Sequence, residues 1–129
     1  LTGDLVNTFT MTGKSQIAVK PVDHSECPSY GIIKPEQDSN NVIEIVEKPA
    51  LGKAPSNLAA IGRYVLTPQI FNILKTQKRG FGGEFQLTDA LNTQANHKEI
   101  GFTELRGKHF DCGSINGYLL AIKHAAENY

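Results

Sequence analysis

One segment constrains the fold of this chain more than any other: the apolar run at residues 42–46, followed by Glu47, Lys48 and Pro49. The near-continuous apolar character predicts a strand over 42–47 that is covered on both faces of a sheet. An acid and a cation at the end of such a strand lie where open α/β sheets bind ligands. The alternative is a strand that leaves the core through residues charged only for solvation and stops at Pro49.

The rest of the pattern is a mixture of strands and helices. A short first helix is ended by Gly13, and Ile17 and Val19 alternate with polar neighbours, which predicts a half-buried strand over 15–22. Further strands are expected over 30–33, 58–66 and 100–106. A helical segment over 84–97 separates the last two, so the order of elements predicts an α/β fold.

Two helix starts carry capping signals. Thr67 before Pro68 predicts an N-cap followed by a first-turn proline, and glycines at 80, 82 and 83 are expected to end that helix. Ser114 is expected to cap the last helix. The spacing of four apolar residues predicts that they face inward from this helix: Ile115, Tyr118, Leu119 and Ile122.

Composition excludes several classes of function. A chain of 129 residues fits one domain, and its net charge of zero provides no broad basic face for nucleic acid. No apolar stretch approaches the roughly 18 residues that a membrane span needs. Cys27 and Cys112 are far apart and lack a metal-binding spacing, so we expect reduced thiols and a cytoplasmic protein. The sequence also lacks a glycine-rich phosphate loop.

Four segments place glycine or charge within or beside strands. They contain Gly31, Glu47 with Lys48, Gly62, and Asp111. Glycine within a strand marks the close approach of a ligand or of another backbone, and a bulge is the competing explanation for Gly31 and Gly62. Asp111 precedes a glycine-containing turn, where a carboxylate that stabilises the turn is the ordinary alternative.

In this order the segments resemble the sugar-nucleotide pyrophosphorylases, and among them the uridylyl-transferring members. The resemblance covers nearly the whole chain, and single motifs such as Glu-Lys-Pro are weak. Its most specific stretches are Ala54-Pro55-Ser56-Asn57-Leu58, Gln86-Leu87-Thr88-Asp89-Ala90 and His109-Phe110-Asp111-Cys112-Gly113. The chain departs from the expected pattern at Phe110, where a histidine directly before the aspartate was expected.

The resemblance implies a fold, a reaction and a set of site residues. The fold is a Rossmann-like mixed sheet with flanking helices, and the reaction makes UDP-glucose and pyrophosphate from UTP and glucose 1-phosphate. Glu47 is then expected to hold sugar hydroxyls, Lys48 to bind the sugar phosphate, and Asp111 to ligate the catalytic Mg²⁺. Gly31, Gly62 and Tyr64 are expected to line the sugar pocket.

The family's nucleotide-binding half has no counterpart in this sequence. Residues 1–129 therefore look like the C-terminal, sugar-phosphate-binding half of a nucleotidyltransferase domain. We expect this piece alone to be inactive, and to self-associate as a homo-oligomer because sheet edges are left exposed. Two alternatives stay open: a non-catalytic sugar-phosphate-binding or assembly module, and a thymidylyl, cytidylyl or adenylyl transferase of the same family.

Overall fold

The computed structural model describes residues 1–79 and 85–128 and shows five strands in one mixed sheet. The strand order is β3-β2-β4-β1-β5, in which only β1 and β5 run parallel. The strands are β1 (Ser15–Pro21), β2 (Gly31–Pro35), β3 (Val42–Glu47), β4 (Leu58–Val65) and β5 (Ile100–Glu104). The predicted α/β class is confirmed.

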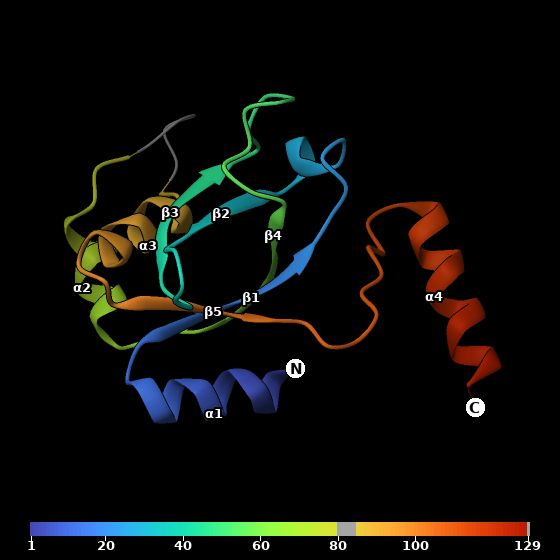
Figure 1. The fold of residues 1–129 in the computed structure, drawn as a ribbon, viewed down its shortest axis with the longest axis horizontal. Coiled ribbons are helices and arrows are strands. Elements are labelled where there is room, and N and C mark those ends of the chain that lie inside the picture. Colours follow the sequence, from blue (N-terminus) through green and yellow to red (C-terminus); the bar gives the residue numbers. More distant parts are fainter. Residues whose placement is uncertain (80–84, 129) are drawn as a thin grey trace.

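Helices lie around this sheet. They are α1 (Thr2–Thr12), α2 (Gln69–Thr76), α3 (Leu87–Asn96) and α4 (Ile115–Glu127), with a short 3-10 turn at Cys27–Ser29. Figure 1 shows α2 and α3 together on one side of the sheet, α1 alongside β1 and β5, and α4 apart from the rest. No helix within 1–79 or 85–128 is long and apolar enough to cross a membrane.

The main core fills the space between the sheet and the pair α2 and α3. It combines apolar side chains from all three parts: Ile17, Val19, Ile33, Val42, Ile45, Ile70, Ala90, Leu91, Ala95 and Ile100. A smaller cluster contains Val22, Cys27, Ile32 and Ala59. The core therefore anchors α3 directly against β3, the strand that carries Glu47 at its end.

The burial of β1 and β3 is the reverse of what the sequence predicts. β1 is an interior strand between β4 and β5 and is buried from Ser15 to Val19, because both α1 and the main core pack against it. β3 is an edge strand, and Ile43 in its middle is 45% exposed. The prediction that β3 is covered on both faces is therefore wrong, and so is the prediction that β1 is half-buried.

The two predicted caps have different outcomes. The Ser114 hydroxyl accepts a hydrogen bond from the Gly117 amide at 3.1 Å, which confirms it as the α4 cap. Thr67 does not cap α2 with its side chain, since its hydroxyl instead bonds the side chains of Gln69 and Gln94. The glycines at 80, 82 and 83, which were expected to end α2, lie outside the described residues.

The expected inward face of α4 is wrong. The helix has no buried residue, and Ile115 is 80% exposed. Tyr118, Leu119 and Ile122 are also exposed. The pattern is amphipathic as predicted, but the described part of the chain places no other element against this face.

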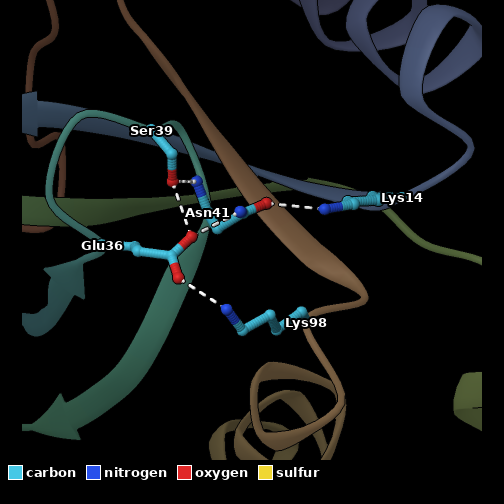
Figure 2. Close-up of polar contacts among 5 residues, drawn as sticks. All are labelled: Lys14, Glu36, Ser39, Asn41 and Lys98. Carbon is cyan, nitrogen blue, oxygen red and sulfur yellow. Dashed lines mark hydrogen bonds and ion pairs between the residues drawn. The ribbon is translucent and has the colours of Figure 1, made fainter.

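The turn between β2 and β3 is held by a polar cluster (Figure 2). Glu36 accepts hydrogen bonds from Ser39 and from Asn41, and forms an ion pair with Lys98 at 2.8 Å. Lys14, just before β1, donates to the Asn41 side chain at 2.7 Å. This cluster joins the hairpin turn to β1 and to the α3–β5 connection, at the opposite end of the hairpin from Glu47.

Stability in acid is expected to depend on Glu36. Hydrogen bonds from Asn41, then from Lys98 and Ser39, lower the pKa of Glu36 from 4.5 to about 2. A carboxyl group whose pKa is lower in the folded than in the unfolded chain stabilises the fold at pH values above its unfolded-state pKa. This stabilisation is lost as the pH falls from about 4.5 towards 2. Thermal unfolding across this range should therefore show a Tm difference between wild type and Glu36→Gln that narrows as pH falls.

Glu44→Gln is the matched control, because Glu44 is an exposed carboxylate on the adjoining strand with no side-chain hydrogen bond among the described residues. Its Tm difference from wild type should stay small throughout. A Glu36→Gln variant whose Tm follows that of wild type in parallel from pH 5 to pH 2 would contradict the role assigned to the cluster.

Candidate functional site

A cavity of about 210 Å³ opens at the end of the β2–β3 hairpin that lies away from the polar cluster. Gly31, Glu47, Gly62 and Tyr64 all line it. These are four of the six predicted site residues, and they come from three neighbouring strands, β2, β3 and β4. Further lining comes from the β2 approach and from α3: Ser29, Tyr30, Ile45, Ala60, Thr88 and Leu91. We call this the sugar cavity, after the pocket that the sequence predicts.

The pairing of β2 with β3 explains why position 31 carries glycine. Gly31 lies directly opposite Glu47, and a Cβ atom added to Gly31 would lie 3.0 Å from Oε2 of Glu47. The Lys48 amide donates to the Tyr30 carbonyl at 3.0 Å. Hydrogen-bonded and non-hydrogen-bonded pairs alternate along an antiparallel ladder, so the next pair, Gly31 and Glu47, is a close non-hydrogen-bonded one. The Glu47 carboxylate therefore occupies the space that a side chain at 31 would need.

Gly62 has a different structural reason. Its φ of +73° lies in the left-handed region, and the register between β1 and β4 shifts at this point, between Ile17 and Val19. Glycine reaches this conformation without the steric cost that a Cβ atom brings. The bulge that was the competing explanation for Gly62 is therefore present, and it lies in the wall of the sugar cavity.

Tyr64 and Glu47 are electrostatically coupled across this cavity. Burial raises the pKa of Tyr64, and the negative charge of Glu47 raises it further. The neutral phenol is therefore the form present around neutral pH. A phenol and a carboxylate that line one small cavity are a suitable donor and acceptor for sugar hydroxyls.

Lys48 lies beside the sugar cavity and not in it. It lines an adjoining hollow of about 470 Å³, which shares Ile45, Glu47 and Thr88 with the sugar cavity. Its backbone φ is +45°, an uncommon value for a residue other than glycine. This turn ends β3, and Lys48, which follows the strand, is exposed.

Asp111 lies in neither hollow. Its side chain is exposed, and Oδ1 accepts a hydrogen bond from the Gly113 amide at 3.0 Å, so it forms the turn that was the ordinary alternative. It still affects the sugar cavity: burial is the main cause of a raised pKa at Tyr30, and the charge of Asp111 is the second.

The residues described here partly fit a magnesium ion. Oδ2 of Asp111 has no hydrogen bond within 1–79 and 85–128, so a hard oxygen ligand is available. Magnesium is usually held by one or two carboxylates together with substrate phosphates and water. No group of three or more His, Cys, Asp or Glu side chains that could hold a metal occurs in that part of the chain. Among these described residues, Asp111 is the carboxylate that the sequence predicts as a ligand.

Sequence reasoning did not assign a role to two residues of α3. The Thr88 hydroxyl donates to Oε2 of Glu47 at 3.0 Å. Asn92, one helical turn later, bonds the backbone of Ile45 twice, accepting from its amide at 2.7 Å and donating to its carbonyl at 2.9 Å. The available signal was their i, i+4 spacing, which places both on one face of a helix.

A larger hollow lies elsewhere among the described residues. It measures about 670 Å³ between α1 and β5, and Asp4, Thr8, Phe102 and Arg106 are among the residues that line it. None of the six predicted site residues lies there, so its size does not make it the candidate site.

Gly31→Ala is expected to weaken sugar binding without unfolding the protein. The new methyl group would displace only the flexible end of Glu47, and alanine restricts the unfolded chain more than glycine does. Calorimetric titration should show glucose 1-phosphate binding about fivefold to tenfold weaker, with an unchanged or higher Tm. Gly3→Ala, where the added methyl meets nothing within 4 Å, is the control. Equal affinity in both variants would show that the placement of Glu47 does not depend on Gly31.

Comparison with known proteins shows the family to which the chain belongs. The nucleotidyl transferase family model matches residues 3–128, and the chain belongs to this family. It is 42% identical to a UTP–glucose-1-phosphate uridylyltransferase from Streptococcus pneumoniae, over 96% of this chain and 44% of that protein. It is 40% identical to an enzyme of the same name from Pseudomonas aeruginosa, over 96% of this chain and 46% of that protein.

A solved structure of a UDP-glucose pyrophosphorylase with UDP-glucose superposes with a TM-score of 0.88 at 40% identity. The match covers 98% of this chain and 49% of the chain in that structure. The structure of a UTP-bound enzyme from Acinetobacter baumannii gives a TM-score of 0.83 at 34% identity. The match covers 97% of this chain and 44% of the chain in that structure. The chain therefore spans under half the length of the relatives it matches.

Proposed function

We propose that this chain forms the C-terminal, sugar-phosphate-binding half of a nucleotidyltransferase that makes UDP-glucose and pyrophosphate from UTP and glucose 1-phosphate. The observation that carries the proposal is the meeting of Gly31, Glu47, Gly62 and Tyr64 in one cavity, with Lys48 at its border. The names of the relatives favour uridylyl transfer over the thymidylyl, cytidylyl and adenylyl alternatives.

The proposed roles follow from the chemistry of each side chain. Glu47 accepts hydrogen bonds from sugar hydroxyls, Tyr64 donates or accepts one, and the Lys48 ammonium binds the sugar phosphate as a point charge. Gly31 and Gly62 leave room for the sugar ring. Because the reactants are both anionic, binding and alignment are what the protein has to supply.

In the reaction, an oxygen of the sugar phosphate attacks the α-phosphorus of UTP. A new bond forms between that oxygen and the phosphorus, the bond to the β-phosphate bridging oxygen breaks, and pyrophosphate leaves. No general base is required, since a phosphate oxygen is already a nucleophile at neutral pH. Asp111 is the proposed ligand of Mg²⁺, which when bound neutralises phosphate charge.

In the part of the chain that the structure describes, this half offers Asp111 as a proposed metal ligand and no glycine-rich phosphate loop, so we propose that it does not transfer nucleotidyl groups alone. UDP-glucose formation by the isolated chain at a rate near that of a full-length relative would contradict this. We also propose that the protein acts in the cytoplasm, which the free thiols of Cys27 and Cys112 support. Homo-oligomer formation stays a prediction, supported by the exposed apolar side chains of α4.

The decisive experiment is calorimetric titration of the chain with glucose 1-phosphate, glucose and inorganic phosphate. The proposed site predicts that glucose 1-phosphate binds more tightly than either component, because Glu47 and Lys48 contact different parts of it. UDP-glucose should also bind, through its glucosyl phosphate. Failure of glucose 1-phosphate to bind at millimolar concentration, or binding no tighter than that of phosphate, would contradict the proposal.

A further inference from the structure

We propose that Thr88 and Asn92 are positioning residues that clamp β3 at two points and so orient Glu47 toward the sugar. This inference rests on the proposed function, because it names residues that prepare the same site. Neither residue is among the six that the sequence assigned. The evidence is the pair of contacts that α3 makes with the edge strand, one to backbone and one to side chain.

The first point of the clamp is Asn92. Its side-chain amide pairs with both backbone groups of Ile45, which are turned away from β2. The side-chain oxygen of Asn92 accepts from the Ile45 amide, and its side-chain nitrogen donates to the Ile45 carbonyl. This is the pattern of hydrogen bonds that a neighbouring strand would provide. Asn92 therefore replaces the missing strand partner at the free edge of β3 and fixes the strand relative to α3 two residues before Glu47.

The second point is Thr88. It lies on α3 one turn before Asn92, and its hydroxyl donates to Oε2 of the exposed Glu47 carboxylate. Oε2 is also the atom that lies over Gly31. Glu47 is therefore held between a glycine on one side and a hydroxyl donor on the other. This leaves Oε1 with no hydrogen bond to a described residue and therefore available to a sugar hydroxyl.

The clamp should act on sugar binding and not on phosphate binding. Lys48 is held by a separate contact, from its amide to the Tyr30 carbonyl. Loss of the Thr88 hydroxyl would release the Glu47 carboxylate into several rotamers, while the backbone hydrogen bond of Lys48 stays in place. Glucose 1-phosphate and inorganic phosphate are therefore ligands that separate the two effects.

The experiment compares Thr88→Val, Thr88→Ser and the control Thr93→Val in the whole 129-residue chain. Thr93 is exposed on the same helix and bonds only the Asp89 carbonyl among the described residues. Thr88→Val should weaken glucose 1-phosphate binding about tenfold, the loss of one hydrogen bond to a charged group. It should leave inorganic phosphate binding unchanged, and Thr88→Ser should restore the affinity. Equal glucose 1-phosphate affinity in Thr88→Val and Thr93→Val would overturn the proposal.

Two ligand-free measurements separate the clamp from the proposed function. Amide hydrogen exchange should speed up at Ile45 in Asn92→Ala and not in Thr93→Val, and the ¹³C signal of the Glu47 carboxyl should move in Thr88→Val. Unchanged exchange or an unmoved signal would overturn the clamp. If these measurements confirm the clamp but the chain binds no glucose 1-phosphate, the contacts of Thr88 and Asn92 stand. The sugar-orienting role and the proposed function are then contradicted.

Discussion

Replacing Lys48 with alanine is expected to weaken glucose 1-phosphate binding about 30-fold to 100-fold, the largest effect on ligand affinity of any single change proposed for this chain. A hydrogen bond between charged groups contributes about 2–3 kcal/mol, which corresponds to that range. Lys48 is exposed and lies at the border of the sugar cavity, so its ammonium group is accessible to a phosphate. Binding of glucose, which lacks the phosphate, should not change.

The measurement is calorimetric titration at two ionic strengths. Wild-type affinity should fall as salt rises, because an exposed ion pair is screened, whereas the affinity of Lys48→Ala should depend less on salt. Lys48→Arg keeps the charge in another shape and should retain part of the affinity. Lys34→Ala, an exposed lysine on β2, is the control. A Lys48→Ala chain that binds as wild type does would exclude Lys48 as the phosphate ligand.

The identity of the strands was predictable from the sequence, but their positions in the sheet were not. Apolar content predicted β3 as buried, yet β3 is an edge strand whose outer backbone is bonded, among the described residues, by Asn92 of α3. Ser15 and Gln16 made β1 look half-exposed, yet both are buried because their polar atoms have partners in the fold. The Ser15 hydroxyl, for example, accepts from the Thr67 amide at 3.0 Å. Periodicity reports the polarity of a strand, whereas burial also depends on which neighbours pair with it.

The candidate site was partly predictable for a related reason. Glycines and charges within strands or at their ends are visible in the sequence, and three of them, Gly31, Glu47 and Gly62, line one cavity together with Tyr64. Thr88 and Asn92 were assigned no role, because their i, i+4 spacing places them on one helix face but does not show which strand that face covers. Asp111, the predicted metal ligand, lies in a turn outside the cavity, a position that the strand pattern does not reveal.

Replacing Leu91 with alanine is expected to lower the free energy of unfolding by about 3 kcal/mol, the usual cost of truncating a buried leucine and leaving a cavity. Leu91 is 2% exposed and belongs to the main core between the sheet and α3. A domain of this size is stable by about 5–15 kcal/mol, so the change would remove a large share of that stability. Urea unfolding should show a lower midpoint with an unchanged slope.

Leu51→Ala is the matched control, because the same atoms are removed from a side chain that is 72% exposed. Its cost should stay within about 0.5 kcal/mol. Leu91 also lines the sugar cavity, so its truncation would widen the wall that faces the bound sugar. If Leu91→Ala unfolds at the same urea concentration as Leu51→Ala, then α3 does not pack on the sheet as described. The proposed clamp on β3 would then be contradicted as well, since Thr88 and Asn92 contact the strand only if α3 packs on the sheet through this leucine.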